Sequence, residues 1–290
     1  MNQHAKNNNS LLKSNPKVSI ICVAYNPGDR AKLTFDSIAA LSYTNTEVIL
    51  IDNCSDAISL RIYESYKSLI SVYCSEPDLG IYDAMNKGVS MASGEWIWFM
   101  NMGDTFAEPK IIERIFSKVN STKIKVIFGD TLVFSGSLKF IKHFYPPIEK
   151  NFKHGILQLN HQSMMMHAEV FEKIGKFDFR KYPIRGDMHH LTKTFFAYQS
   201  AAFLHVEFVL AKYLEDGVSS NANNLLKMFD EDIAMQKEFN TLFNIPSIWV
   251  KKWYSYAKSR GLNSIKSNLI FYRFYRRFKY YFVTNIEEQK

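Results

Sequence analysis

Oxygen-bearing side chains stand at the ends of four apolar segments of this 290-residue chain. Carboxylates accept hydrogen bonds, and amides both donate and accept them, so these groups can hold a polar ligand if the fold brings them to one place. The four segment ends carry Tyr25-Asn26, Asp52-Asn53, Glu76-Pro77-Asp78, and Asn101 with Asp104.

The segments before these groups have the pattern of buried strands. Residues 17–25 form a continuous apolar run rich in β-branched residues, which is typical of a strand buried on both faces of a parallel sheet. Residues 46–53 and 70–77 predict two further strands, and the apolar run that begins at Glu95 predicts a fourth.

Helical segments separate these strands. The first follows a turn at 26–29 and runs to about Leu41, and the second starts at Ser55 or Asp56 as a cap. The apolar positions expected to mark the buried faces of the second and third helices are Ile58, Ile62, Tyr66 and Leu69, and then Ile81, Met85 and Val89, with Gly94 as the stop.

This order predicts a doubly wound α/β sheet, mostly parallel, with right-handed crossovers. Ligands bind such sheets beyond the carboxyl ends of the strands, so the four polar ends would meet at one rim. The motifs GxGxxG and GxxxxGK[ST] are missing, which argues against a nicotinamide fold and against a P-loop.

The composition is that of a globular protein with a substantial core, because 47% of the residues are hydrophobic. Cys22, Cys54 and Cys74 form no CxxC pair, so we interpret them as structural thiols in a reducing compartment. The polar residues 1–16 lack the apolar core of a signal peptide, and no window reaches the roughly 18 apolar residues of a spanning helix. We therefore expect a disordered leader and a cytoplasmic protein.

The net charge of +8 is concentrated near the C-terminus, where nine Lys or Arg residues lie between Lys251 and Lys279. At helical spacing, residues 265–282 place Phe and Tyr on one side and Lys and Arg on the other. This pattern predicts a helix that lies in an anionic membrane interface. A helix packed on the body is the alternative, and nucleic-acid binding is a weaker one because the charge is confined to the tail.

Four motifs resemble the family 2 glycosyltransferases with the GT-A fold, over about residues 17–216. They read VSIICVAYN, VILIDNCSD, SEPDLGIYDAMNKGVSMASGEWIWFMNMGD and HQSMMMHAEVFEKIGKFDFRKYPIRGD, and the third is the most specific. The chain looks closest to bacterial members that assemble colanic acid, capsule or O-antigen repeat units. The resemblance implies a Rossmann-like, mostly parallel central sheet flanked by helices, here followed by the basic amphipathic tail.

The resemblance also implies a nucleotide-sugar donor bound across the first half of the sheet. Tyr25 would pack on the base, and Asp52 would accept from a base N–H or the ribose, which suits a UDP-sugar or a GDP-sugar. Asp78 and Asp83 would face ribose or diphosphate. Asp52 could instead be a capping residue, and Asp83 could simply favour the first turn of its helix. The expected donor-binding residues are Ala24, Tyr25, Asn26, Asp52, Asp78, Gly80, Asp83, Asn86, Asn101 and Gly103.

For the metal, the resemblance aligns Asp104 with the last acid of a DxD-type motif, which holds Mg²⁺ or Mn²⁺ on the diphosphate. Asn101 and Gly103 stand where acids often occur, so one carboxylate remains. The alternative for Asp104 is a plain turn residue.

For the acceptor, Asp187 matches the acid that serves as general base in this family. His189 replaces a downstream acid and could assist the acceptor or make a structural hydrogen bond. His161 matches an HQ pair near the acceptor or metal, although it could be an ordinary satisfied polar group. We interpret the methionines at 164–166 as core.

Together these implications predict an inverting transferase of hexosyl or N-acetylhexosaminyl type, peripheral on the inner face of the plasma membrane. Its acceptor would be a lipid-linked or oligosaccharide glycan in bacterial surface polysaccharide synthesis, and no nucleic-acid partner is expected. A catalytically silent nucleotide-sugar binder is the alternative, against which Asp187 argues. The predicted domain covers 17–245, divided into a donor half at 17–105 and an acceptor half at 106–245, before the tail at 246–290.

Overall fold

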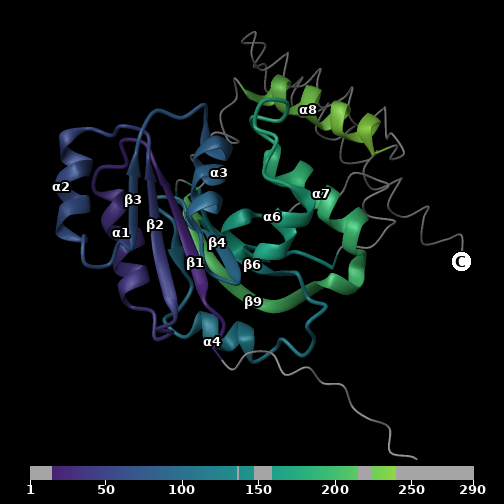
Figure 1. The fold of residues 1–290 in the computed structure, drawn as a ribbon, viewed down its shortest axis with the longest axis horizontal. Coiled ribbons are helices and arrows are strands. Elements are labelled where there is room, and N and C mark those ends of the chain that lie inside the picture. Colours follow the sequence, from purple (N-terminus) through teal and green to yellow (C-terminus); the bar gives the residue numbers. More distant parts are fainter. Residues whose placement is uncertain (1–14, 136, 147–158, 215–223, 240–290) are drawn as a thin grey trace, which may run out of the picture. The chain divides into compact units, whose positions relative to one another are not determined.

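The computed structural model describes residues 15–135, 137–146, 159–214 and 224–239 (Figure 1). Most of the predicted leader and all of the predicted tail lie outside these residues. Within the described part, no helix is long and apolar enough to cross a membrane.

The chain divides into two compact units. One comprises Met1–Glu149 with Leu157–Glu215, and the other comprises Lys150–Ile156 with Asp216–Lys290. Helix α8 (Leu225–Glu238) is described in the second unit, whereas the sequence placed it in the transferase domain. The boundary at 245 remains a prediction, and the rest of the description concerns the first unit.

The first half of this unit is a parallel sheet whose strands alternate with helices (Figure 1). The strands pair in the order β3-β2-β1-β4, each parallel to its neighbour, which confirms the predicted doubly wound pattern. All seven residues of β1 are buried, as the continuous apolar run requires. The elements are β1 (Val18–Ala24), α1 (Arg30–Ala39), β2 (Thr46–Asp52), α2 (Ala57–Ser65), β3 (Val72–Ser75), α3 (Ile81–Met91) and β4 (Trp96–Phe99).

Helices cover both faces of this sheet. Alternate β1 residues such as Ile20 and Cys22 share one core cluster with apolar side chains of α1 and α2. The opposite face of β1 meets α3, where a Cβ on Gly88 would lie 2.4 Å from Cγ2 of Ile21. Only glycine permits this close approach, so Gly88 fixes how near α3 lies to the strand.

The second half adds antiparallel strands, which the sequence did not predict. Strand β8 lies between β4 and β6 and is antiparallel to both, while β9 runs parallel to β6. The sheet is therefore mixed. The methionines of β8 are buried, so their predicted core role is confirmed. The elements are β5 (Thr105–Phe106), α4 (Ile111–Phe116), β6 (Val126–Ser135), β7 (Leu138–Lys142), η1 (His161–Ser163), β8 (Met164–His167), α6 (Ala168–Ile174), α7 (Gly186–Tyr198), η2 (Ser200–Ala202) and β9 (Phe203–Leu214).

Two local expectations need correction. Strand β3 has four residues instead of the eight expected at 70–77, although the Ser71 and Glu76 N–H groups on either side of it still donate to carbonyls of β2. In α2 the buried side chains are Ser59, Ile62 and Tyr63, while Ile58 is 57% exposed. The predicted stripe was wrong at Ile58, because the buried face of the helix is formed by Ser59, Ile62 and Tyr63. Asp56 is the cap, and its carboxylate accepts from the Ser59 N–H at 2.8 Å.

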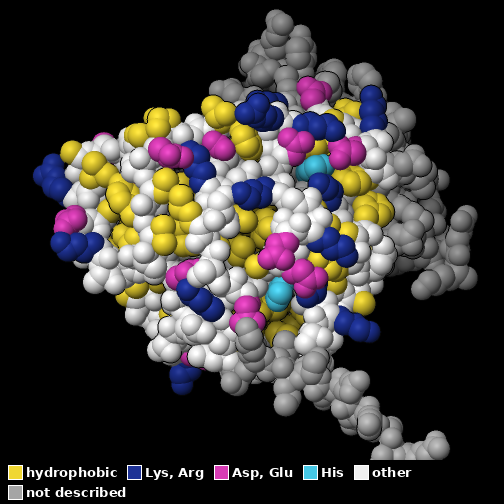
Figure 2. Space-filling view, viewed as in Figure 1, with side chains coloured by type: hydrophobic (Ala, Val, Ile, Leu, Met, Phe, Trp, Pro, Cys, Tyr) yellow, Lys and Arg dark blue, Asp and Glu magenta, His cyan; other side chains and the backbone are white. Residues whose placement is uncertain are grey.

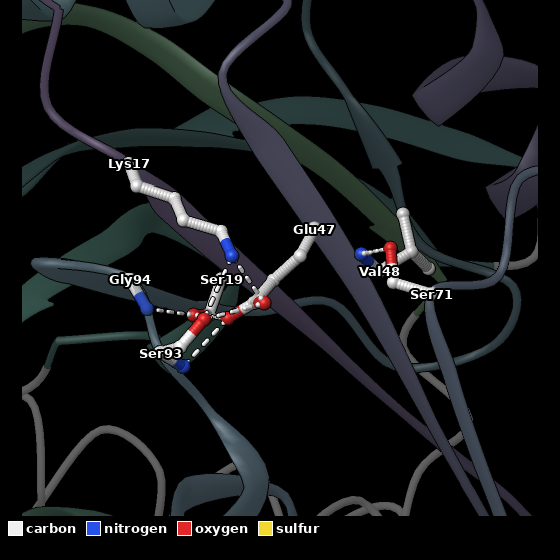
Figure 3. Close-up of polar contacts among 7 residues, drawn as sticks. All are labelled: Lys17, Ser19, Glu47, Val48, Ser71, Ser93 and Gly94. Carbon is white, nitrogen blue, oxygen red and sulfur yellow. Dashed lines mark hydrogen bonds and ion pairs between the residues drawn. The ribbon is translucent and has the colours of Figure 1, made fainter.

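A polar cluster joins β1, β2 and the turn before β4 at the edge opposite the polar strand ends (Figure 3). The Glu47 carboxylate accepts hydrogen bonds from Lys17 Nζ (2.7 Å), Ser19 Oγ (2.5 Å) and the Ser93 N–H (2.6 Å). Burial opposes ionisation, but these donors outweigh it and lower the pKa of Glu47 to about 2. A Cβ on Gly94 would lie 2.6 Å from the Ser19 nitrogen, so this turn also needs glycine.

Candidate active site at the carboxyl ends of the strands

The loops that follow β1 and β2 form the donor side of the candidate site. Tyr25 directly follows β1 and is 68% exposed, so its ring is available as a stacking surface. Asn26 adopts a left-handed backbone (φ 47°). Its Oδ1 accepts from the Asp56 N–H at 2.7 Å and its N–H donates to Ser55 Oγ at 2.8 Å, so the two loops are tied together.

Asp52, the last residue of β2, holds these loops through hydrogen bonds to its side chain. The residue is wholly buried, and its carboxylate accepts from the Ser55 N–H (3.0 Å), Ser75 Oγ (2.8 Å) and the Tyr63 hydroxyl (3.2 Å). These donors come from the ends of β2 and β3 and from α2. The Asp52 carboxylate therefore holds together the loops at the ends of β2 and β3. Its contact with a nucleobase stays a prediction, and that contact would require the loop after β2 to open.

The turn before α3 gathers acidic groups. The Asp78 carboxylate accepts from the Gly80 N–H at 2.8 Å, and Asp83 accepts from the Leu79 N–H at 2.9 Å. Gly80 has φ 119°, a conformation that L side chains rarely adopt. Burial raises the pKa of Asp78, with the charges of Asp83 and Asp52 adding to the shift against the opposing effect of Lys87. Neighbouring carboxylates accept hydrogen bonds from sugar hydroxyls but repel phosphate oxygens, so this turn suits a sugar better than a phosphate without a bound cation.

The turn after β4 is held by a threonine from α1. Thr34 Oγ1 donates to the Asp104 carbonyl at 2.8 Å and accepts from the Gly103 N–H at 2.8 Å. Gly103 has φ 103°, so glycine is required here too. The turn brings Asn101 and Asp104, three positions apart, close together, because the Asp104 N–H donates to the Asn101 carbonyl at 3.0 Å.

This turn fits a hard divalent cation. Asp104 is 7% exposed, and Oδ1 of Asn101 is buried without a hydrogen-bond partner. Burial raises the pKa of the Cys22 thiol to about 12, and the charge of Asp104 contributes to this shift. Within the described residues, no group of three or more His, Cys, Asp or Glu side chains could hold a metal. An ion here would need phosphate or water oxygens besides Asp104 and Asn101.

Asp187, at the start of α7, is hydrogen-bonded through both oxygen atoms. Its Oδ1 accepts from the Tyr82 hydroxyl at 2.7 Å and from the Met188 N–H at 2.8 Å, and its Oδ2 lies 3.0 Å from Nδ1 of His161. Nε2 of His161 lies 2.9 Å from Nδ2 of Asn101. A continuous chain of contacts therefore runs from Tyr82 through Asp187 and His161 to Asn101, which we call the Tyr82–Asn101 chain.

The hydrogen bonds in this chain have a defined direction in the neutral ring. A carboxylate only accepts, so Nδ1 of His161 donates to Asp187, and Nε2 then accepts from the Asn101 amide. Burial acts to raise the pKa of Asp187, but the hydrogen bonds from His161, Tyr82 and Met188 outweigh it and lower the pKa. Asp187 is thus held as the ionised form, which is the form that can accept a proton.

Gly186 lets Tyr82 reach Asp187. A Cβ at Gly186 would lie 2.7 Å from Cδ2 of the Tyr82 ring, so the ring packs directly on this backbone. The Tyr82 hydroxyl also lies 3.1 Å from the Ile184 carbonyl. Tyr82 and Gly186 were not among the predicted site residues. The sequence holds one indication of their role, which is that both residues lie inside the motifs quoted for the family resemblance.

Acidic and histidine side chains also gather on the surface in Figure 2, over the region where β4, β6 and β9 lie in Figure 1. Lysines and arginines are interspersed on the same face instead of forming one basic field. This distribution agrees with a body that is close to neutral once the basic tail is set aside.

Three other predicted site residues have structural contacts. Both amide atoms of Asn86 bond to the Phe177 backbone at 2.9 Å, which ties α3 to the loop after α6. His189 is buried and stacks on Tyr182 with ring centroids 4.2 Å apart. Ala24 is a buried strand residue. His189 thus has a structural packing contact, while the predicted structural hydrogen bond and the predicted catalytic role both stay predictions.

The sequence matches a known family and several characterised structures. Residues 19–205 match the family model described as Glycosyl transferase family 2. An uncharacterized glycosyltransferase of Mycobacterium tuberculosis is 28% identical over 172 residues, which are 58% of this chain and 64% of that protein, less than two thirds of its length. A PGL/p-HBAD biosynthesis glycosyltransferase of Mycobacterium bovis is 26% identical over 82% of this chain and 91% of that protein.

Two solved structures show the fold. The mannosyltransferase PcManGT of Pyrobaculum calidifontis, in complex with GDP-Man and Mn²⁺, has a TM-score of 0.61 at 15% identity, covering 92% of this chain and 84% of that one. Staphylococcus aureus TarS, in complex with UDP-GlcNAc, has a TM-score of 0.58 at 13% identity, covering 83% and 73%. The mixed sheet, its flanking helices and the family match agree, and the chain therefore belongs to glycosyl transferase family 2, with the GT-A fold.

Proposed function

We propose that this chain is an inverting glycosyltransferase that moves a sugar from a nucleotide diphosphate to a lipid-linked glycan acceptor in bacterial surface polysaccharide synthesis. The observation that carries the proposal is the Tyr82–Asn101 chain. It joins an ionised carboxylate to the turn that carries Asn101 and Asp104. A proton acceptor and a diphosphate-binding turn would then stand on either side of one reacting carbon.

In the proposed reaction, the acceptor hydroxyl attacks the anomeric carbon from the side opposite the diphosphate. The new bond joins that carbon to the acceptor oxygen, and the bond to the diphosphate oxygen breaks with its electron pair leaving on the nucleotide. Asp187 takes the hydroxyl proton through the remaining lone pair of Oδ2. Tyr82 and His161 hold its carboxylate in one orientation during this transfer.

The turn after β4 would serve the leaving group. Asp104 and Oδ1 of Asn101 are the residues that would hold Mg²⁺ or Mn²⁺, and such an ion would supply positive charge for the departing diphosphate. Thr34 keeps this turn closed from the side of α1. The complex of PcManGT with GDP-Man and Mn²⁺ supports a metal-dependent donor.

The donor is proposed to be a UDP-sugar, with a GDP-sugar as the alternative. The exposed ring of Tyr25 offers a stacking face for the base, and the carboxylates near Asp78 suit ribose hydroxyls. TarS was solved with UDP-GlcNAc and PcManGT with GDP-Man, which supports both classes. A hexosyl or N-acetylhexosaminyl group and an acceptor like those of colanic acid, capsule or O-antigen enzymes are parts of the same proposal.

Two measurements test this function in order. Saturation-transfer NMR against a panel of UDP- and GDP-sugars, with and without Mn²⁺, identifies the donor. The chosen donor, radiolabelled, is then incubated with a bacterial membrane lipid fraction, and the anomeric configuration of the product is determined by NMR. We expect metal-dependent binding and an inverted product. A retained configuration would contradict the proposed mechanism, and binding without transfer to any acceptor would indicate a silent binder.

A further inference from the structure

The hairpin of β6 and β7 gives the acceptor half an exposed apolar edge. Strand β7 pairs with β6 from Ser135↔Leu138 to Thr131↔Lys142, and no other described strand pairs with β7. Leu138 is 66% exposed, Phe140 43% and Ile141 46%. Because side chains alternate along a strand, Leu138 and Phe140 lie on one face of β7 and Ile141 on the other. Both faces of the strand therefore present apolar groups to solvent.

Basic residues interleave with these apolar ones. Lys139 and Lys142 lie on β7, His143 follows, and Tyr145 is 73% exposed just beyond. No Asp or Glu occurs between residues 131 and 146. Lysine carries its charge on a long apolar stem, so it can keep the ammonium group at a polar boundary while its neighbours enter an apolar layer.

Hydrogen bonds fix this hairpin to the candidate site. The buried Asp130 carboxylate accepts from Nδ1 of His143 at 2.7 Å and from the Phe144 N–H at 3.2 Å. Lys142 Nζ donates to Oδ1 of Asn160 at 3.1 Å, and Asn160 directly precedes His161 of the Tyr82–Asn101 chain. These hydrogen bonds therefore hold the exposed edge close to His161, which contacts the proposed base Asp187.

We propose that residues 138–145 form a docking surface for an anionic phospholipid bilayer, which we call the β7 surface. This extends the proposed function, because it brings the acceptor side of the site to the layer that contains a lipid-linked acceptor. A helix or strand surface with basic and aromatic residues binds such interfaces through apolar burial and attraction to anionic headgroups. Tyrosine suits this boundary because its ring is apolar and its hydroxyl is polar.

A second copy of the chain fits this edge less well. Antiparallel pairing of β7 with another β7 would place lysines opposite or near lysines, and like charges directly opposite each other destabilise a strand pair. Lysines on an edge strand also discourage pairing with other strands in general. The same lysine charges attract anionic headgroups, so an anionic bilayer fits the β7 surface better than a second copy of the chain does.

The test is flotation of the full-length protein with vesicles of phosphatidylglycerol and phosphatidylcholine. Leu138→Gln combined with Ile141→Gln should lower the partition coefficient about ten-fold, since two apolar side chains no longer enter the bilayer. The matched control is Leu33→Gln with Ile58→Gln, which removes the same residue types from α1 and α2 at 51% and 57% exposure. The control should float like the wild type, and vesicles of phosphatidylcholine alone should bind all forms weakly.

Donor-nucleotide affinity and sedimentation are measured on the same samples. Flotation of the β7 variant at the wild-type level would overturn the proposal, since any membrane contact would then come from elsewhere, including the basic tail. A change in sedimentation with unchanged flotation would instead identify a self-association surface and also overturn it. If the β7 variant loses nucleotide binding, Lys139→Glu is tested in its place, because it reverses one exposed charge. Weaker flotation of Lys139→Glu would support the β7 surface, and unchanged flotation would exclude it. Absence of glycosyl transfer would not affect any of these outcomes.

Discussion

Asp187 is the proposed general base, and both of its carboxylate oxygens are held by hydrogen bonds. Tyr82 and His161 approach it from opposite halves of the sheet, one from α3 and the other from η1. Their donors favour the ionised carboxylate over the desolvation that burial imposes, and its pKa lies below the ordinary value. An oriented and ionised carboxylate is what a general base requires.

Replacing Asp187 by Asn separates the base from the donor site. The amide keeps the shape but cannot take a proton, so transfer should fall by about 10²- to 10⁴-fold. Donor affinity should stay within a few-fold, since the donor loops lie at the ends of β1 to β4. Radiolabelled transfer paired with nucleotide titration reports both quantities, with the exposed Asp178→Asn as the control variant. Near-normal transfer would move the base to His161 or His189, and parallel loss of donor binding would make Asp187 structural.

Tyr82→Phe tests whether the tyrosine positions the base. Its hydroxyl is one of the donors that lower the pKa of Asp187, so removing it should raise that pKa. Since the ionised base is the active form, the acidic limb of the kcat profile should move to higher pH, while the KM for the donor is retained. Tyr43→Phe is the matched control, because it loses a hydrogen bond of the same 2.7 Å length to the remote Pro16 carbonyl. A uniform loss of activity with an unmoved acidic limb would argue that Tyr82 only supports the fold.

Asp104→Ala tests the proposed cation site. Without this carboxylate, Mn²⁺ should no longer strengthen nucleotide binding in calorimetry, whereas metal-free binding and the thermal midpoint change little. Asp36→Ala removes an exposed carboxylate of α1 that accepts a hydrogen bond from the Tyr66 hydroxyl, and it should behave as the wild type. Equal Mn²⁺ dependence in both variants would exclude Asp104 from the site.

At the scale of elements, glycines and short polar side chains set how the layers meet. Gly88 brings α3 against β1, Gly186 brings α7 against Tyr82, and Gly94 brings the turn before β4 against β1. Thr34 of α1 then closes the turn that follows β4. The site is thus assembled by helices that approach the sheet closely, and the opposite edge is fastened by the cluster around Glu47 (Figure 3).

Glu47→Gln should destabilise the fold at neutral pH. The folded pKa of about 2 lies below the ordinary value of 4.5, so the stabilisation is complete above the unfolded pKa and is lost as pH falls from about 4.5 to about 2. The shift corresponds to about 3 kcal/mol. Chemical unfolding of the variant at pH 7 should show a loss of about 2–4 kcal/mol and a flatter decline below pH 4.5.

Glu64→Gln is the control for that measurement. Its pair with Lys67 is exposed, and such pairs contribute about 0–1 kcal/mol. An equal effect of the two substitutions would refute a special role for the buried cluster.

At the scale of the whole molecule, the described body and the C-terminal segment differ in charge, because nine Lys or Arg residues lie between Lys251 and Lys279. The body carries the sheet, the candidate site and the β7 surface, and its charges of both signs are mixed. The basic residues between Lys251 and Lys279 lie outside the described part, so their predicted amphipathic helix at 265–282 stays a prediction.

Truncation before about Trp253 tests that tail. The predicted basic and aromatic helix should contribute to membrane binding, so the truncated protein should shift from the membrane pellet toward the soluble fraction. Moderate salt should shift the full-length protein in part, because headgroup attraction is screened. Equal flotation with and without the tail would assign that segment to packing. The β7 variants, measured in the full-length chain, separate the two contributions.

The sequence alone determined the features that depend on neighbours along the chain. The apolar run of β1, the capping by Asp56 and the polar residues at each strand end are local patterns, and the parallel first half of the sheet follows from strands alternating with helices. The quoted motifs also carry the resemblance to the family whose model matches residues 19–205.

Only the tertiary structure decided which distant groups meet. The insertion of β8 between β4 and β6 brings His161 to Asn101, 60 positions apart, and α7 brings Asp187 to Tyr82, 105 positions apart. The same pairings bury Asp52 beneath three donors and leave β7 with β6 as its one partner among the described strands. No local periodicity encodes these outcomes, because they depend on strand order and on how closely glycines let the layers approach, and both are settled only when the whole sheet packs.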